Sequence, residues 1–160
     1  MPHLSEGKRM SRDGARNLIA AVAKAMGRTK LNVNSFKDRL LMQKGCFVLN
    51  RMGVDPKYRF DLYIRGPYSS ELAGDYYDLL NGTGMTYETD VDPGHIRELS
   101  VLIDKGTPFL EAYATLGLVL SYNPGLDTDR LIEFVTDMKP HLKKEIREAS
   151  EYRINGQFVI

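Results

Sequence analysis

Residues 107–122, Thr-Pro-Phe-Leu-Glu-Ala-Tyr-Ala-Thr-Leu-Gly-Leu-Val-Leu-Ser-Tyr, constrain the fold of this chain more than any other segment. Their only charged side chain is that of Glu111, and Thr107-Pro108 places a proline where the first turn of a helix accepts one. A helix that is apolar on all sides has to be buried by other elements. The sequence therefore predicts a central helix over 107–122 with the remaining elements packed around it.

Helix start signals recur on both sides of this segment. Each is a polar residue, able to accept hydrogen bonds from free backbone N–H groups, or a proline, placed before an apolar stripe of helical period. The predicted helices run from Ser11 to about Met26, from Asn34 or Ser35 to about Met52, from Ser69 or Ser70 to about Asn81, from Asp92 to about Asp104, from Asp127 or Thr128 to about Lys139, and from Pro140 onward.

Strand signals are short. In residues 58–65, Phe60, Leu62 and Ile64 alternate with polar or charged neighbours, which predicts a half-buried strand that Gly66-Pro67 breaks. Residues 85–89 and 153–160 are predicted as further short strands. The predicted fold class is mainly α (α+β), a compact bundle of about seven helices with a small two- or three-stranded β element.

A chain of 160 residues favours one domain. Residues 1–10 show no hydrophobic period, so we predict a flexible tail at 1–10 and a single domain over 11–160. No apolar run approaches the length of a membrane span, and the first residues lack the apolar core of a signal peptide. We therefore expect no membrane association and a cytoplasmic location. Cys46, the only cysteine, is expected in the core.

Charge is distributed unevenly along the chain. Residues 1–44 carry ten Lys and Arg against three Asp and Glu, a net charge of +7, although the whole chain is at +1. A basic region of this kind is typical of nucleic-acid binding, so a transcriptional regulator that uses the basic N-terminal helices is one hypothesis. Solvation of the outer faces of these helices is the alternative.

Residues with catalytic or metal-binding chemistry are scattered. The histidines, His3, His95 and His141, lie far apart in the sequence. Asp90, Asp92 and His95 lie close together and suggest a metal-dependent hydrolase as a further hypothesis, although Asp92 before Pro93 also suits a helix cap. We predict no catalytic residue and no cofactor.

Gln43 requires a hydrogen-bond partner. Its amide lies on an apolar helix face, and an amide buried without partners costs about 1–3 kcal/mol. The bend at Gly66-Pro67 offers backbone N–H and C=O groups to a side chain such as Gln43 or Arg39. The apolar residues on this helix face are Phe36, Leu40, Phe47 and Val48.

Residues 58–77 hold six of the fifteen aromatic side chains. Aromatic clusters with polar hydroxyls suit recognition surfaces, and they also suit a corner that organises the core. Both interpretations remain open for this cluster. Its members are Tyr58, Phe60, Tyr63, Tyr68, Tyr76 and Tyr77.

Two strings of the sequence together resemble a known family. They are Phe36-Lys-Asp-Arg-Leu-Leu-Met-Gln-Lys-Gly-Cys-Phe47 and Tyr58-Arg-Phe-Asp-Leu-Tyr-Ile-Arg-Gly-Pro-Tyr-Ser69. Both are similar to the YwgA-like family of small bacterial and archaeal proteins and, more distantly, to the Panacea (SocA-like) antitoxin domain. Met138-Lys139-Pro140 is similar to a C-terminal Lys-Pro segment of the same proteins. The resemblance spans residues 36–150.

The resemblance implies a mainly helical domain without known catalytic residues. It also implies an antitoxin-like or adaptor protein that binds a partner protein, such as a toxin or part of a protease system. A second copy of the chain is a further partner that the sequence leaves open. The motif carries over as binding or framework positions to Arg39, Gln43, Lys44, Phe60, Tyr63, Gly66, Pro67, Tyr68 and Ser69.

Overall fold

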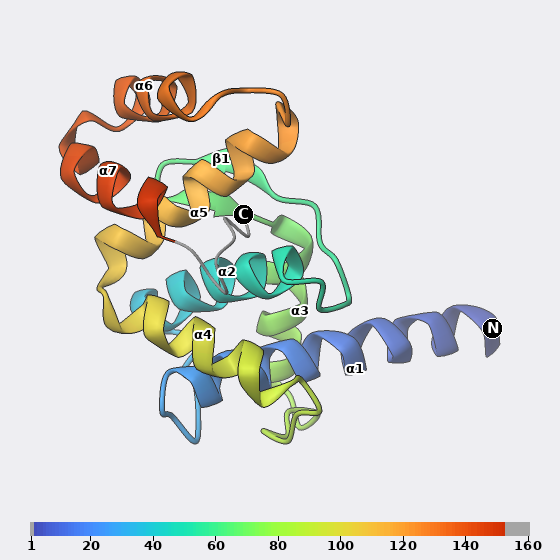
Figure 1. Cartoon of the computed structure of the whole chain (residues 1–160). Coiled ribbons are helices and arrows are strands. Elements are labelled where there is room, and N and C mark those ends of the chain that lie inside the picture. The colour runs from blue at the N-terminus through green and yellow to red at the C-terminus, as the bar shows by residue number, and fades with distance from the viewer. Residues whose placement is uncertain (1, 153–160) are drawn as a thin grey trace.

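The computed structural model describes the backbone of residues 2–152 and the side chains of residues 12–152. Within these residues the fold is mainly α with a small two-stranded antiparallel sheet, which confirms the predicted class (Figure 1). No described helix combines the length and apolar character that crossing a membrane would require. The elements are α1 (Pro2–Ala25), α2 (Phe36–Arg51), β1 (Asp61–Tyr63), β2 (Gly66–Tyr68), α3 (Ser70–Asn81), α4 (Pro93–Asp104), α5 (Thr107–Tyr122), α6 (Thr128–Met138), the 3-10 turn η1 (Pro140–Leu142) and α7 (Lys143–Glu151).

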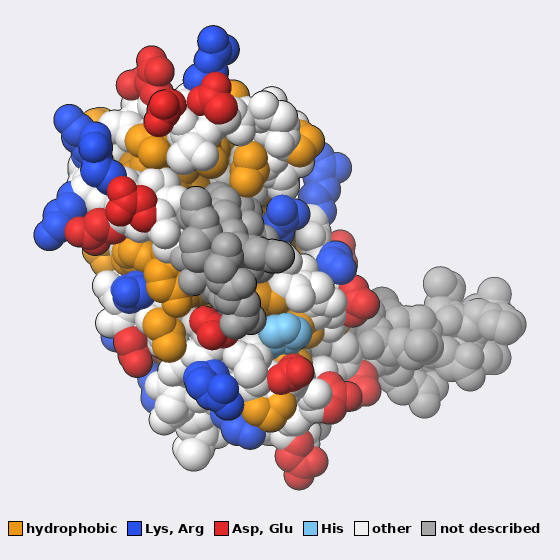
Figure 2. All heavy atoms as spheres, in the orientation of Figure 1, with side chains coloured by type: hydrophobic (Ala, Val, Ile, Leu, Met, Phe, Trp, Pro, Cys, Tyr) orange, Lys and Arg blue, Asp and Glu red, His pale blue; other side chains and the backbone are white. Residues whose placement is uncertain are grey.

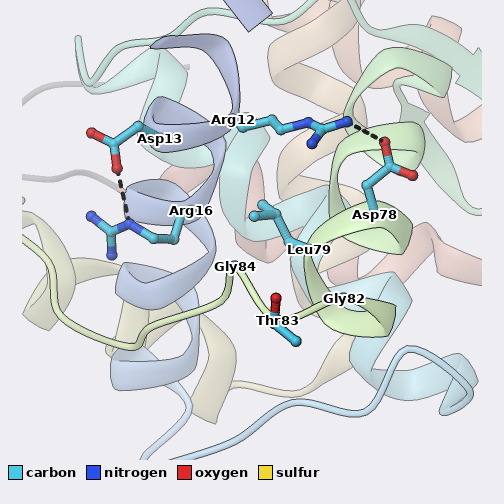
Figure 3. Close-up of a pocket in the computed structure, with 8 residues that line it drawn as sticks. All are labelled: Arg12, Asp13, Arg16, Asp78, Leu79, Gly82, Thr83 and Gly84. Carbon is cyan, nitrogen blue, oxygen red and sulfur yellow. Dashed lines mark hydrogen bonds and ion pairs between the residues drawn. The ribbon is translucent and has the colours of Figure 1, made fainter. Parts of the chain in front are cut away.

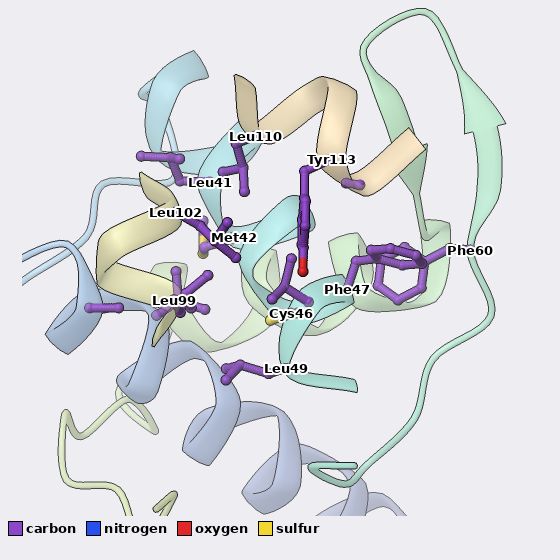
Figure 4. Close-up of a cluster of buried hydrophobic side chains, with 14 of the residues drawn as sticks. Leu41, Met42, Cys46, Phe47, Leu49, Phe60, Leu99, Leu102, Leu110 and Tyr113 are labelled. Carbon is purple, nitrogen blue, oxygen red and sulfur yellow. The ribbon is translucent and has the colours of Figure 1, made fainter. Parts of the chain in front are cut away.

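Helix α5 is the central helix that the sequence predicts. Residues 109–119 are all buried, and the helix contacts α2, α4, α6, α7 and both strands. Leu110 and Tyr113 from α5 meet Met42 and Cys46 from α2 in the core (Figure 4). Burial raises the pKa of the Cys46 thiol, and the predicted core position of this residue is confirmed.

Helices α1 and α2 pack closely because Gly45 lacks a side chain. A Cβ atom at Gly45 would lie 2.9 Å from the Val22 Cγ2 atom, closer than real Cβ contacts come. The mid-helix glycine therefore permits an approach of α2 to α1 that a larger residue would prevent.

The predicted caps fix most helix starts. Ser35 accepts from the Asp38 N–H at 3.2 Å, and Ser69 accepts from the Leu72 N–H at 3.2 Å. Asp92 and Asp127 cap α4 and α6 in the same manner. Each cap satisfies a backbone N–H that the helix leaves free, so these boundaries are confirmed.

Helix α1 starts earlier than predicted, at Pro2 instead of Ser11. Proline is well suited to a first helical position. In the described backbone, the first turns of α1 extend away from the rest of the molecule (Figure 1).

The strand predicted over residues 58–65 is wrong in extent and in burial. Strand β1 contains only Asp61–Tyr63, and Gly66-Pro67, expected to break the strand, belongs to β2. The two strands form a hairpin in which Tyr63 is opposite Gly66. Ile64 and Arg65 form the turn between them, which leaves Ile64 87% exposed and Leu62 40% exposed, so only Phe60 of the expected inner face is buried.

Residues 84–91 form a loop without a strand, which contradicts the strand predicted at 85–89. Arg16 Nη1 on α1 donates to the backbone oxygens of Thr86 and Glu88 at 3.0 and 2.6 Å. Asn17 accepts from the Asp90 N–H at 3.0 Å and donates to its carboxylate at 2.7 Å. Side chains of α1 thus replace a partner strand. The terminal strand predicted at 153–160 lies outside the described residues.

Candidate functional site

Gln43 joins α2 to the start of α3 through both ends of its amide. Its Nε2 atom donates to the Ser69 backbone oxygen at 2.9 Å, and its Oε1 atom accepts from the Ser69 N–H at 2.8 Å. Both residues are buried. The prediction that this amide bonds the backbone near the Gly-Pro bend is confirmed for Gln43. Arg39 instead donates to the Val33 oxygen at 2.8 Å.

The hairpin lies directly against α5 at Gly66. This residue has a φ of +100°, and a Cβ atom there would lie 3.1 Å from the Thr115 Oγ1 atom and 3.6 Å from the Lys44 Cε atom. Glycine is therefore required by conformation and by space. The contact brings the hairpin turn close to the charged side chains of α2 and α5.

Three charged side chains are buried beneath the hairpin: Lys44, Glu111 and Lys139. The Lys139 ammonium lies 3.4 Å from the Glu111 carboxylate and donates to the Ile64 oxygen at 2.6 Å. Lys44 is 2% exposed and has no hydrogen bond or ion pair to any residue that the structure describes. Two buried ammonium groups thus share one buried carboxylate.

Burial lowers the pKa of Lys44 from 10.5 to about 8. The charge of Glu111 opposes this shift, whereas the positive charges of Lys139 and Arg65 add to it. The lowered pKa reports a positive charge that its surroundings do not fully compensate.

A cavity of about 250 Å³, which we call the hairpin pocket, opens between α2, the hairpin and α3. Seven of the nine sequence-predicted positions line it: Arg39, Gln43, Lys44, Tyr63, Gly66, Pro67 and Tyr68. The other lining residues are Phe36, Leu40, Ile64, Arg65, Tyr76 and Tyr77. Three of all these residues are cationic and none is acidic.

Three of the residues that the sequence analysis selected lie elsewhere. Phe60 packs edge-on against Phe47 in the core, with ring centroids 5.2 Å apart, and Ser69 lies behind Gln43. The Tyr58 hydroxyl donates to the Asp75 carboxylate at 2.7 Å, and burial together with this contact raises its pKa. None of these three residues lines the hairpin pocket.

The rim of the hairpin pocket carries large exposed side chains. Phe36, expected on a buried face, is 55% exposed, and Tyr63 is 56% exposed. The guanidinium groups of Arg39 and Arg65 lie 5.9 and 5.5 Å from the centre of the Phe36 ring. Phe36 is exposed because it is the first residue of α2, beyond the cover of the neighbouring helices.

The sequence analysis did not assign Arg65, Glu111 or Lys139 to the site. A single charge in an otherwise apolar helix was a usable signal for Glu111, since a buried carboxylate requires a partner. Its partner lies in the Lys-Pro segment, which the sequence identified only as part of the family resemblance. No local pattern relates Arg65 to the pocket.

A second cavity of about 740 Å³ lies between α1, α3 and the segment after α3 (Figure 3). Its charges pair with each other: Arg12 lies 3.5 Å from the Asp78 carboxylate and Arg16 lies 3.2 Å from that of Asp13. Arg16 also bonds the 84–91 segment. This cavity therefore has no buried cation without a partner among the residues described, in contrast to the hairpin pocket.

The acidic residues of the proposed metal site have structural partners. Asp90 accepts from Asn17 at 2.7 Å, and Asp92 accepts from the Gly94 N–H at 2.7 Å as the cap of α4. Across residues 12–152, no three His, Cys, Asp or Glu side chains are grouped in a way that would hold a metal ion.

Several of the basic side chains described between residues 12 and 51 are paired or buried. Arg12, Arg16 and Arg28 pair with carboxylates. Lys44 is buried, which leaves Lys24, Lys30 and Lys37 as exposed lysines without a described ion pair. In the view of Figure 2, acidic and basic side chains are interspersed.

Comparisons with models of known protein families, with curated proteins and with solved structures found no match.

Proposed function

We propose that this chain is a cytoplasmic, non-enzymatic protein-interaction module, antitoxin-like or adaptor in type, that holds a partner protein at the hairpin pocket. The observation that carries the proposal is the coincidence of the pocket with the motif. The Gln-Lys helix and the Gly-Pro-Tyr hairpin, which carry the family resemblance, supply seven residues of one cavity.

The chemistry of the pocket supports recognition of a protein. Tyr63, Ile64 and Phe36 are large, exposed and grouped around one cavity. Interfaces are enriched in aromatic residues and Arg, and their strongest contacts are side chains that fill pockets. The buried Gln43–Ser69 pair holds the pocket wall in one geometry before any partner arrives.

Binding of nucleic acid has less support. Arg12, Arg16 and Arg28 pair with carboxylates within the chain and Lys44 is buried, which reduces the number of described cations that can contact phosphates. If phosphate contacts dominated, binding would weaken steeply as salt rises. Anisotropy with labelled duplex DNA at low salt distinguishes the two functions, because the proposed module gives no salt-sensitive binding at micromolar concentration.

The proposal is tested by partner capture followed by reconstitution. The tagged chain is purified from its native host, the stoichiometric partner is identified, and its affinity is measured with purified components. Ile64→Ser removes an exposed aliphatic side chain from the pocket rim, and Val101→Ser removes one from α4, away from the pocket. We expect Ile64→Ser to weaken partner binding about tenfold or more and Val101→Ser to leave it unchanged.

Equal binding by the two variants would place the interface elsewhere on the molecule. Failure to recover any stoichiometric partner, together with failure to neutralise a toxin encoded by an adjacent gene, would overturn the function itself.

A further inference from the structure

The ammonium group of Lys44 borders the hairpin pocket. Lys44 is 2% exposed, and no described residue bonds or pairs with it. The nearby carboxylate, Glu111, already lies 3.4 Å from the Lys139 ammonium. The two buried ammonium groups of Lys44 and Lys139 thus have one described carboxylate near them, and a further negative charge would lower the cost of burying both.

The rest of the pocket has the same sign of charge. Arg39 and Arg65 stand beside the Phe36 ring at the rim, and none of the thirteen lining residues is Asp or Glu. Clefts lined by one sign of charge concentrate ligands of the opposite sign. The pocket is therefore built for an anion, and a carboxylate is the anion that a protein partner carries.

The size and the lining of the pocket restrict how the carboxylate is presented. Apart from the cations and Gln43, the lining is aromatic, aliphatic or glycine, and the cavity of about 250 Å³ is smaller than those that hold drug-sized ligands. A C-terminal residue presents its carboxylate and its side chain from one Cα atom, so both fit one small cavity. To present an internal acidic residue with an apolar neighbour, the partner chain would have to enter the cavity and leave it again.

We propose that the hairpin pocket binds the C-terminal residue of the partner protein, with its α-carboxylate on Lys44 and an aromatic or large aliphatic side chain among the tyrosines. This inference rests on the proposed function, because it names the chemistry of the partner segment. Arg39 and Arg65 add attraction at the rim for an acidic end of the partner chain.

The probe is the peptide Gly-Ser-Gly-Ser-Phe with fluorescein on its N-terminus, titrated with the full chain and followed by anisotropy. The same peptide with a C-terminal amide lacks only the negative charge. We expect the amide to bind at least about tenfold more weakly, because it loses a charge-assisted hydrogen bond to a buried ammonium. Equal affinity of acid and amide would overturn the inference.

Substitutions in the chain test whether the peptide binds at the hairpin pocket. Lys44→Met keeps the apolar part of the side chain as far as the Cε position and removes the charge, and it should weaken binding of the acid peptide to the level of the amide. Lys37→Met, an exposed lysine on the same helix outside the pocket, is the matched control and should bind as wild type does. Arg65→Met changes a rim residue on the exposed turn and should weaken binding of the acid peptide severalfold. This variant keeps the test valid if Lys44→Met does not fold.

Further measurements distinguish a peptide C-terminus from a small free acid as the ligand. They also distinguish a failure of this inference from a failure of the proposed function. N-acetylphenylalanine presents the same α-carboxylate and side chain and should compete with the peptide, whereas acetate competing equally well would show that the pocket takes any small acid and would overturn the assignment to a C-terminal residue. If the captured partner, extended at its C-terminus by a few glycines, still binds while Ile64→Ser abolishes binding, the proposed function stands and this inference fails. If the glycine-extended partner no longer binds, and Lys44→Met shows the same loss of binding, the result supports both the proposed function and this inference.

Discussion

The amide of Gln43 bonds both the N–H and the C=O of Ser69, in the same way as a neighbouring backbone would. Replacing Gln43 by Leu keeps the apolar volume of the site but leaves two backbone groups buried without partners. We expect Gln43→Leu to lower the free energy of unfolding by about 2–4 kcal/mol, measured by urea denaturation.

Lys37→Leu is the control for this change, because Lys37 is exposed on the same helix. Its effect should stay within about 0.5 kcal/mol. A Gln43→Leu variant as stable as wild type would show that water replaces the lost bonds.

Lys44 makes stability depend on pH. Its pKa is about 8 in the folded chain and 10.5 as an ordinary lysine, so the unfolded state binds more protons between these values. The free energy of unfolding therefore rises with pH from 8 to 10.5, and the penalty for a charged Lys44 is fully present below pH 8. Lys44→Met lacks this penalty. We expect it to be more stable than wild type at pH 7, by on the order of 3 kcal/mol.

This advantage should shrink as pH approaches 10.5, in unfolding curves recorded in steps of pH. Tyr58 and Tyr76, whose pKa values burial raises, affect both proteins equally and cancel in the difference. A constant difference between wild type and Lys44→Met across this range would mean that Lys44 titrates as an exposed lysine.

Among the elements, the hairpin depends most on its neighbours. Two strands of three residues each are too short to be stable alone. The Tyr122 hydroxyl of α5 donates to the Phe60 oxygen at 2.7 Å, and Lys139 donates to the Ile64 oxygen at 2.6 Å. The hairpin is thus positioned by contacts from the second half of the chain.

Replacing either of two glycines by alanine should change the stability of the protein, in opposite directions at the two positions. At Gly66, where φ is +100° and Thr115 leaves 3.1 Å, Ala should lower the free energy of unfolding by about 1–3 kcal/mol. Gly74, inside α3 with open space around it, should accept Ala with a gain of about 0.5–1 kcal/mol. Thermal unfolding of both variants is the measurement, and a stable Gly66→Ala protein would contradict the close contact between hairpin and α5.

The helices could be predicted from the sequence and the strands could not, for a physical reason. Caps such as Ser35 and Asp92 act within three residues of themselves, so local sequence contains the whole signal. Burial of Leu62 and Ile64 depends on which distant element covers these two side chains, and no described element does. The alternation of apolar residues in 58–65 therefore indicated extended backbone correctly and burial wrongly.

At the scale of the whole molecule, the Glu111–Lys139 pair connects the central helix with the segment that follows α6. Lys139→Met should lower the free energy of unfolding by about 3 kcal/mol, because Glu111 loses its ion pair while buried. Adding Glu111→Gln should restore part of the loss. The measurement is chemical denaturation, combined with hydrogen exchange at residues 62–66, which should become faster.

Lys144→Met is the matched control, since Lys144 forms an exposed pair with Glu148 at 4.0 Å. A surface pair contributes little, so stability should change by less than about 1 kcal/mol. An equal effect of Lys144→Met and Lys139→Met would contradict a structural role of the buried pair.

The candidate site was predictable in part. Gln43, Lys44 and Gly66 carry local signals, namely a polar residue on an apolar face and a glycine at a bend. The positions of Glu111 and Lys139 beneath the hairpin follow from contacts between residues far apart in the chain, such as Lys139 with Ile64. Hydrophobic period and caps do not encode such pairings.

The segment 84–91, held on α1 by Arg16, has a consequence for tolerance to sequence change. Arg16 Nη1 bonds the carbonyl oxygens of Thr86 and Glu88, groups that every amino acid possesses. A mutational scan of position 88, where the side chain is exposed, should therefore find many accepted residues, whereas position 16 should accept few. Positions 86, 87, 89 and 90 should accept fewer residues than position 88, because the side chains there form hydrogen bonds of their own with Arg16, Leu31 or Asn17.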